Sequence, residues 1–355
     1  MDRKKTRAVF CGSVQIGGGA PVSIQSMTNT FTEDVEATTA QIEALANAGA
    51  DIVRCAVPTL KAAEAFKEIK NRVQNVPLVA DIHFDYKLAL AAIEAGADKI
   101  RINPGNIGGT EKLKAVADAA GSAGIPIRIG VNGGSVEKDL LDLYERRPAE
   151  ALAKSAFRNI GILRGFGFDD IVVSIKCSDI LTNTAAHKIL SGETDLPLHI
   201  GITEAGIGRA AIVKSAAGIG GLLAMGIGDT IRVSLTGDPV EEVYTAKDIL
   251  RSVNMLPGQI TLISCPTCGR CRVDLAALCE EALKALEALE PAKRPLTAAL
   301  MGCAVNGPGE AAHADAGVAF GADGGVYFEK GVQVRSVKTD EIVPTLVKGI
   351  TAANE

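Results

Sequence analysis

Residues 48–54 read Ala-Gly-Ala-Asp-Ile-Val-Arg, and the phrase returns at residues 95–101 as Ala-Gly-Ala-Asp-Lys-Ile-Arg. Each copy is typical of a helix that ends at a glycine, followed by a short link and a buried strand. Looser copies occur at residues 124–128, 168–176 and 228–233. A unit that repeats in this way predicts a chain built from successive strand–helix pairs.

Apolar segments that alternate with alanine-rich helical stretches complete this pattern. We expect eight strands, near residues 22–26, 51–55, 77–82, 98–102, 126–130, 170–175, 198–202 and 230–234. Eight strand–helix alternations within about 250 residues predict a (β/α)8 TIM barrel. A doubly wound open sheet is the alternative that the periodicity leaves open.

The length of 355 residues allows a barrel and one smaller domain. Residues 255–259, Met-Leu-Pro-Gly-Gln, are typical of a domain junction. We therefore assign residues 1–255 to the barrel and residues 256–355 to a small α+β domain.

Composition argues against several classes of protein. A net charge of −5, no tryptophan and only 4 tyrosines argue against a nucleic-acid-binding surface. We expect no membrane span, because the longest uncharged stretch is short and rich in glycine, and no signal peptide. Eight cysteines without a secretion signal predict thiols or metal ligands in a reducing cytoplasm.

Five cationic side chains fall at or just before the carboxyl ends of predicted strands, where barrel active sites form. They are Arg54, Arg101, Arg128, Lys176 and Arg232. Cations gathered at one barrel mouth repel one another unless a multiply charged anion, such as a diphosphate, lies among them. Acidic, amide and imidazole groups join them at neighbouring strand ends: Asp81, His83, Asn103, Asn106, Asn132 and Glu204.

The predicted small domain carries a run of three cysteines, Cys265, Cys268 and Cys271, and later Cys303 and Glu310. Thiolates spaced in this way can converge on a soft cation or an iron–sulfur cluster. A zinc ribbon would need a second paired knuckle, which the sequence lacks. Several sulfur ligands plus one exchangeable oxygen ligand suit a cluster that reacts at one iron. The alternative is a non-redox phosphate-binding barrel with a structural zinc.

Several long motifs in the same order resemble the bacterial 4-hydroxy-3-methylbut-2-en-1-yl diphosphate synthases of the methylerythritol phosphate route to isoprenoids. The motifs lie at residues 22–30, 53–58, 103–108, 130–135, 201–206 and 264–270. The resemblance implies reductive ring opening and dehydroxylation of 2-C-methyl-D-erythritol 2,4-cyclodiphosphate to (E)-4-hydroxy-3-methylbut-2-enyl diphosphate. It also implies a homodimer in which the cluster domain of one subunit covers the barrel mouth of the other.

Site residues carry over from the family position by position. The resemblance implies a 4Fe-4S cluster held by Cys265, Cys268, Cys303 and Glu310, and Glu204 as the acid. The matching substrate-binding positions are Arg54, Asp81, His83, Arg101, Arg128, Asn132, Lys176, Arg232, Ser234 and Asn306. The electron donor should be a ferredoxin or flavodoxin, because no nucleotide-binding fingerprint is present.

Cys271 is a departure from the family's ligand pattern. Either Glu310 completes the ligand set and Cys271 is a nearby spare thiol, or Cys271 replaces Glu310. We favour the first arrangement, because ligation by sulfur alone would remove the exchangeable position.

Overall fold

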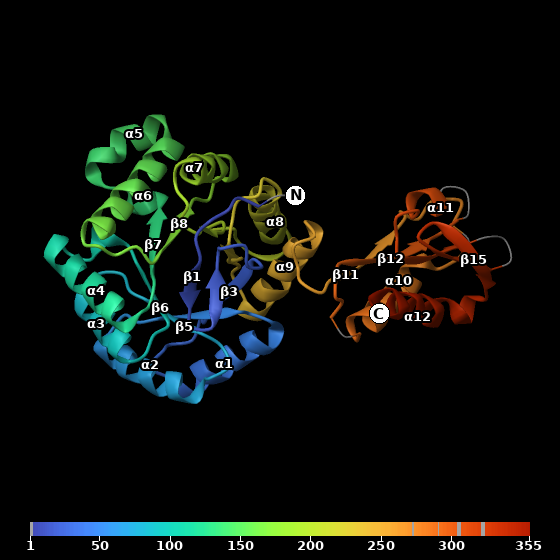
Figure 1. Cartoon of the computed structure of the whole chain (residues 1–355), viewed down its shortest axis with the longest axis horizontal. Coiled ribbons are helices and arrows are strands. Elements are labelled where there is room, and N and C mark those ends of the chain that lie inside the picture. The colour runs from blue at the N-terminus through green and yellow to red at the C-terminus, as the bar shows by residue number, and fades with distance from the viewer. Residues whose placement is uncertain (1–2, 272, 290, 304–306, 321–323) are drawn as a thin grey trace. The chain divides into compact units, whose positions relative to one another are not determined.

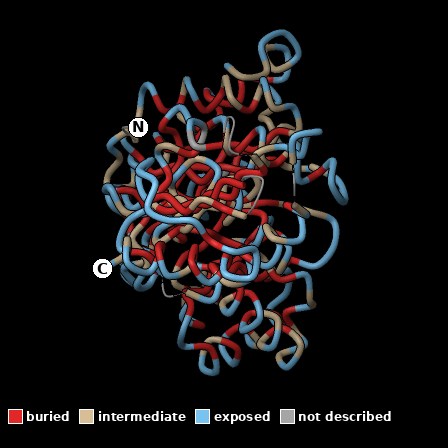
Figure 2. Tube along the Cα trace, turned by 90° about the vertical axis from the view of Figure 1, so that its right-hand side faces the viewer, coloured by how far each residue is buried: buried red, intermediate tan, exposed pale blue. Residues whose placement is uncertain are grey.

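The computed structural model describes residues 3–271, 273–289, 291–303, 307–320 and 324–355. The chain divides into two compact units, Met1–Val253 and Asn254–Glu355. Buried residues, red in Figure 2, gather in the interior of the trace, and exposed residues gather in the outer loops. Within the described residues, no helix is both long and apolar enough to cross a bilayer.

The first unit is a parallel barrel surrounded by helices (Figure 1). Its eight strands are β3 (Ser23–Met27), β4 (Ile52–Ala56), β5 (Leu78–Asp81), β6 (Lys99–Ile102), β7 (Ile127–Asn132), β8 (Ile171–Lys176), β9 (His199–Ile200) and β10 (Thr230–Ile231). They pair in the order β8-β7-β6-β5-β4-β3-β10-β9, and a parallel bridge between Val173 and Leu198 joins the two ends. This closure confirms the TIM barrel and removes the open-sheet alternative.

Helices follow the strands in alternation. They are α1 (Val35–Ala48), α2 (Leu60–Arg72), α3 (Tyr86–Glu94), α4 (Thr110–Ala123), α5 (Leu141–Arg146), α6 (Pro148–Gly165), α7 (Ile180–Glu193), α8 (Gly208–Ala224) and α9 (Pro239–Ser252). The repeated phrase ends α1 as predicted. Gly49 adopts a left-handed conformation (φ 103°), and its N–H bonds back to the carbonyl of Ala46. A side chain would be strained at that angle, so glycine suits this helix end.

The aspartate of the repeated phrase has a specific structural role. Each such carboxylate accepts the backbone N–H at or beside the start of an adjacent strand, which fixes the strand register at the amino end of the barrel. The pairs are Asp51 with Ile24 (2.7 Å), Asp98 with Leu78 (2.7 Å) and Asp229 with Leu198 (2.8 Å).

A short hairpin that the sequence did not reveal closes the amino end of the barrel. It consists of β1 (Val9–Cys11) and β2 (Val14–Ile16), paired antiparallel. Its apolar side chains pack on Ile52, Val79 and Val172 from the barrel strands. Strands of three residues are too short to show a periodicity of their own.

The second unit is a five-stranded mixed sheet with helices packed against it, the α+β arrangement that we predicted. Its strands are β11 (Ile260–Ser264), β12 (Leu296–Met301), β13 (Ala316–Phe320), β14 (Gly325–Glu329) and β15 (Val332–Val337), in that order. The pairs β11–β12 and β12–β13 are parallel, and the last two pairs are antiparallel. Its helices are α10 (Leu275–Glu287), α11 (Gly307–Glu310) and α12 (Ile342–Asn354), of which α10 and α12 contribute to the main core.

Candidate active site

A cavity of about 190 Å³ lies at the carboxyl end of the barrel strands. Its lining residues are Arg54, Asp81, His83, Arg101, Arg128, Asn132, Ser174, Lys176, Thr203, Arg232 and Ser234. The structure therefore brings together nine of the ten predicted substrate-binding residues. The tenth, Asn306, lies outside the described residues.

Strand register explains why these side chains share one space. In parallel strands, paired residues point to the same face of the sheet, and every second residue returns to it. Arg101 pairs with both Asp81 and Arg128, and Asn132 pairs with Lys176. Arg128 is the second residue of β7, so it lies deeper in the barrel than the strand-end position that we expected.

Sequence reasoning missed Ser174 and Thr203 as lining residues. Ser174 lies two residues before Lys176 in β8 and therefore points to the same face. Thr203 directly precedes Glu204 in the loop after β9. Alternation along β8 could have identified Ser174, whereas a single hydroxyl in a loop carries no such signal.

Asp81 is the single carboxylate among the described residues that line the cavity, and two arginines and a histidine share it. Its Oδ1 lies 3.0 Å from Arg101 Nη1, and its Oδ2 lies 3.8 Å from Arg54 Nε and 3.4 Å from His83 Nε2. Burial by itself would raise the pKa of Asp81. The charges of Arg54 and Arg101 and the contact with His83 hold that pKa well below its ordinary value, so Asp81 is ionised.

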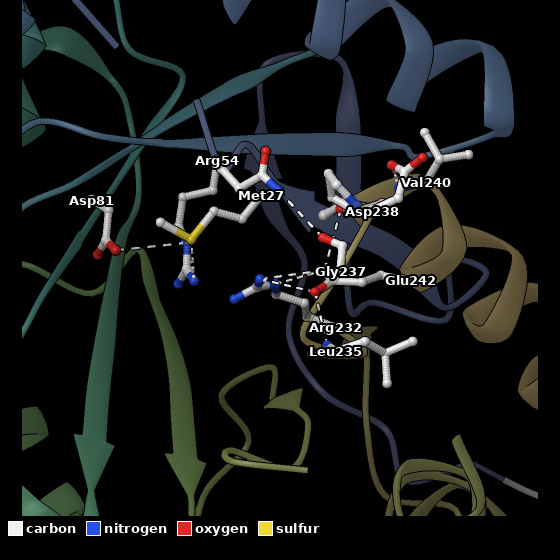
Figure 3. Close-up of polar contacts among 12 residues, drawn as sticks. Met27, Arg54, Asp81, Arg232, Leu235, Gly237, Asp238, Val240 and Glu242 are labelled. Carbon is white, nitrogen blue, oxygen red and sulfur yellow. Dashed lines mark hydrogen bonds and ion pairs between the residues drawn. The ribbon is translucent and has the colours of Figure 1, made fainter. Parts of the chain in front are cut away.

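Arg54 has a weak acceptor as its nearest partner. Its Nε and Nη2 lie 3.2 and 2.9 Å from the thioether sulfur of Met27 (Figure 3). Burial lowers the pKa of Arg54 to about 10, although Asp81 opposes that shift. A thioether carries no charge, so most of the positive charge of Arg54 remains available to a ligand.

Arg128 and Lys176 are even less compensated. Burial and the charges of neighbouring arginines lower the pKa of Arg128 and of Lys176 well below their ordinary values. Two buried nitrogens of Arg128, Nε and Nη2, lack a hydrogen-bond partner within the described part of the chain. A buried cation without an acceptor is costly, so the arrangement favours a bound anion.

Glu204, the predicted acid, lies at the rim and is not among the residues that line the cavity. It is exposed, and its backbone is left-handed (φ 53°). Such an angle is uncommon for a residue other than glycine and requires support from its surroundings. The role of Glu204 stays a prediction.

Topology places the predicted thiol ligands at one edge of the second sheet. Cys265 follows β11 directly, and Cys303 comes two residues after β12, which is the parallel neighbour of β11. The backbone N–H of Gly302 donates to Cys265 Sγ at 3.2 Å. Such N–H···S contacts stabilise a thiolate and tune bound metal centres.

The donor chemistry fits a soft metal or an iron–sulfur cluster. All eight cysteines lie in the described part of the chain as reduced thiols. Among the described side chains no three potential ligands are gathered closely enough to hold a metal, and the side chain of Glu310 lies outside the description. The ligand set of Cys265, Cys268, Cys303 and Glu310 therefore stays a prediction.

Cys271 lies against the same edge. Its thiol donates to the carbonyl of Val273 at 3.3 Å, and a Cβ built on Gly302 would lie 2.7 Å from its sulfur. This engagement with the backbone agrees with a spare thiol, and the choice between Cys271 and Glu310 stays open to experiment.

Comparisons with known proteins agree with this geometry. The chain matches the GcpE TIM-barrel domain over residues 6–247 and the GcpE protein C-terminal domain over residues 261–352. Two curated relatives, from Caldanaerobacter subterraneus subsp. tengcongensis and Clostridium perfringens, are each 52% identical over 348 residues. The match covers 98% of this chain and 97% and 99% of theirs. Both carry the name 4-hydroxy-3-methylbut-2-en-1-yl diphosphate synthase (flavodoxin).

One solved structure shares the architecture at low identity. The N-acetylneuraminic acid (sialic acid) synthetase of Leptospira borgpetersenii serovar Hardjo-bovis superposes with a TM-score of 0.50 at 13% identity. The match covers 80% of this chain and 98% of that one. A likeness at this identity reflects the fold alone.

Proposed function

The chain belongs to the GcpE family, and from this premise we propose that it synthesises (E)-4-hydroxy-3-methylbut-2-enyl diphosphate for isoprenoid precursors. The substrate is 2-C-methyl-D-erythritol 2,4-cyclodiphosphate. Two electrons and a proton are consumed. A ring C–O bond to phosphate breaks, a hydroxyl leaves as water and a carbon–carbon double bond forms. A non-redox barrel with structural zinc gains no support, since the curated relatives are named as flavodoxin-linked synthases.

The observation that carries the proposal is the charge imbalance of the cavity. Of the residues that the structure describes, five cations line it together with one carboxylate, Asp81. A diphosphate supplies the missing negative charge. Ring opening also frees a phosphate oxygen and so adds negative charge to the ligand. Fixed cations around that oxygen stabilise the opened form more than the closed one, which is the property that accelerates the step.

The redox component would be a 4Fe-4S cluster held by Cys265, Cys268, Cys303 and Glu310. When bound, it supplies single electrons and a Lewis-acidic iron. The carboxylate of Glu310 would be a harder ligand than a thiolate, which suits the one exchangeable ligand position that this chemistry needs. The Gly302 N–H stabilises the sulfur of Cys265.

A proton must reach the departing hydroxyl. We assign this role to Glu204, whose neighbour Thr203 lines the cavity. Asn306 would contact the substrate from the cluster domain. His83 is half-exposed at the cavity, and its Nε2 lies 3.0 Å from Arg101 and 3.4 Å from Asp81, so we assign it to holding this pair in place.

A homodimer and a flavodoxin donor complete the proposal. The mouth of the barrel carries exposed apolar side chains that a covering surface would bury: Phe31 (85% exposed), Phe84 (73%), Leu181 (79%) and Ile207 (71%). They follow β3, β5, β8 and β9. This rim supports the prediction that the cluster domain of a second copy covers the mouth. The reduced cysteines favour a cytoplasmic enzyme.

Anaerobic turnover of the cyclodiphosphate with a chemical reductant or reduced flavodoxin tests the proposal, with iron quantified on the same sample. We expect product and about four irons per chain. Colourless protein with stoichiometric zinc and no turnover, after anaerobic purification and reconstitution, would refute it.

A further inference from the structure

Glu242 is a buried carboxylate behind the cavity that neither the sequence motifs nor the proposed function uses. It lies in the first turn of α9, where the helix dipole favours negative charge. Its Oε2 lies 3.3 Å from Arg232 Nε, and its Oε1 lies 3.4 Å from Arg232 Nη2. Oε1 also accepts the backbone N–H of Leu235 at 3.0 Å (Figure 3).

We infer that Glu242 is a positioning residue for the diphosphate site, acting through Arg232. Arg232 lines the cavity and Glu242 does not. Figure 3 shows one end of the Arg232 guanidinium turned towards Glu242 and the other towards Arg54. The inference rests on the proposed function, because it assigns Arg232 to the phosphate groups.

Repulsion between like charges makes this support necessary. Arg232 lies close enough to Arg54 for its charge to lower the pKa of Arg54. Without an acceptor behind it, the Arg232 guanidinium would be driven away from the other cations in the ligand-free protein. Glu242 offers two oxygens to two guanidinium nitrogens. It therefore orients the Arg232 guanidinium and also compensates its positive charge.

The same carboxylate also holds the loop between β10 and α9. The Leu235 N–H bonds to Glu242, and the next residue, Thr236, donates its N–H to the carbonyl of Gly206 at 3.0 Å. Gly206 belongs to the loop that carries Glu204. Glu242 therefore supports both an anion-binding side chain and, through one backbone bond, the loop of the predicted acid.

Removal of the Glu242 charge has a second effect, which would change the affinity for anions in the opposite direction. If Glu242 only neutralised charge, its removal would make the cavity more positive and would tighten anion binding. If Glu242 positions Arg232, its removal weakens binding. Orientation should dominate, because glutamine places an NH2 donor where the carboxylate offers Oε2 to Arg232 Nε, so the contact with two guanidinium nitrogens is lost.

The test compares Glu242→Gln with Glu241→Gln, an exposed neighbour in the same helical turn. Calorimetry on the full chain measures the Kd of inorganic pyrophosphate, and anaerobic kinetics measure KM and kcat. We expect Glu242→Gln to raise Kd and KM about tenfold, the equivalent of about 1.4 kcal/mol, and Glu241→Gln to change neither. In an Arg232→Gln background, Glu242→Gln should change Kd less than about twofold.

Unchanged or tighter pyrophosphate binding, or the same tenfold loss in the Arg232→Gln background, would overturn the inference. Should Glu242→Gln fail to fold, Glu242→Asp decides by the same criteria. It keeps the charge but shortens the reach, so we expect a smaller rise in Kd. A wild-type protein that binds pyrophosphate but never converts the cyclodiphosphate would refute the proposed function and leave the comparison on Glu242 valid.

Discussion

Replacement of Asp81 by asparagine tests the idea that one carboxylate holds the cavity together. Asp81 lies 3.0 Å from Arg101 and 3.8 Å from Arg54, and both of these ion pairs are buried. Removing one partner of a buried pair leaves an uncompensated charge and costs about 3–5 kcal/mol. For a unit the size of this barrel, 1 kcal/mol shifts Tm by roughly 2–4 °C. We therefore expect Asp81→Asn to lower the Tm of the barrel by at least about 6 °C.

Asp118→Asn is the matched control. Its carboxylate lies 2.6 Å from Lys114 Nζ, closer than either pair of Asp81, but both side chains are about half exposed (48% and 54%). Exposed pairs contribute only about 0–1 kcal/mol, so the control should shift Tm by no more than about 4 °C. Calorimetric or circular-dichroism melts at neutral pH measure both variants. Equal, small Tm shifts in the two variants would refute the argument that burial, rather than distance, determines how much an ion pair contributes to stability.

The pH dependence gives a second readout for the same variant. The folded pKa of Asp81 is depressed, so its contribution to stability is complete above the unfolded value of 3.8 and declines as pH falls below it. The Tm difference between wild type and Asp81→Asn should therefore be constant from about pH 5 to 7 and shrink below about pH 4. A difference that grew on acidification would contradict the assignment of an ionised Asp81.

Other substitutions test the remaining parts of the site. Glu310→Ala should nearly abolish turnover, whereas Cys271→Ser should leave turnover and iron content largely intact; the reverse result would assign Cys271 as the ligand. At Gly201, a Cβ would lie 2.6 Å from the carbonyl of Arg232 and 3.1 Å from Lys176 Nζ, so Gly201→Ala should lower Tm and weaken pyrophosphate binding. Gly192→Ala, in α7 with open space around its Cβ, should instead raise stability by about 0.5–1 kcal/mol in the same melts.

The barrel could be predicted because its local signals are repeated and consistent. The glycine that ends α1 and the aspartate that follows it have separate roles: Gly49 ends the helix, and Asp51 fixes strand register by accepting the N–H of Ile24 in the neighbouring strand β3. Both roles require a particular residue type, so the phrase at residues 48–54 occurs again at residues 95–101. The hairpin of β1 and β2 has no such requirement. It is held by burial against Ile52 and Val79, contacts that only the closed barrel creates.

The cations of the site and Asp81 could be predicted for a related reason, and the other acceptors could not. A charged residue in an apolar strand is conspicuous, and alternation sends it into the barrel. The acceptors come from unrelated positions: a thioether in β3 for Arg54 and a carboxylate in α9 for Arg232. At the start of a helix a glutamate is ordinary, because the dipole favours it there, so the sequence gives no sign that Glu242 faces the barrel.

Some of the buried cations have an acceptor within the protein and others do not, and this explains how the cluster is compatible with a folded barrel. Asp81 pairs with Arg101 and Glu242 pairs with Arg232, while Arg128 keeps two nitrogens without an acceptor among the described residues. Full neutralisation would make the barrel more stable but would leave nothing for a diphosphate to satisfy. Partial neutralisation holds the side chains in place and reserves the unsatisfied hydrogen bonds for the ligand. Binding energy then comes from groups that the fold has already desolvated and oriented, which is the condition under which electrostatic stabilisation is strongest.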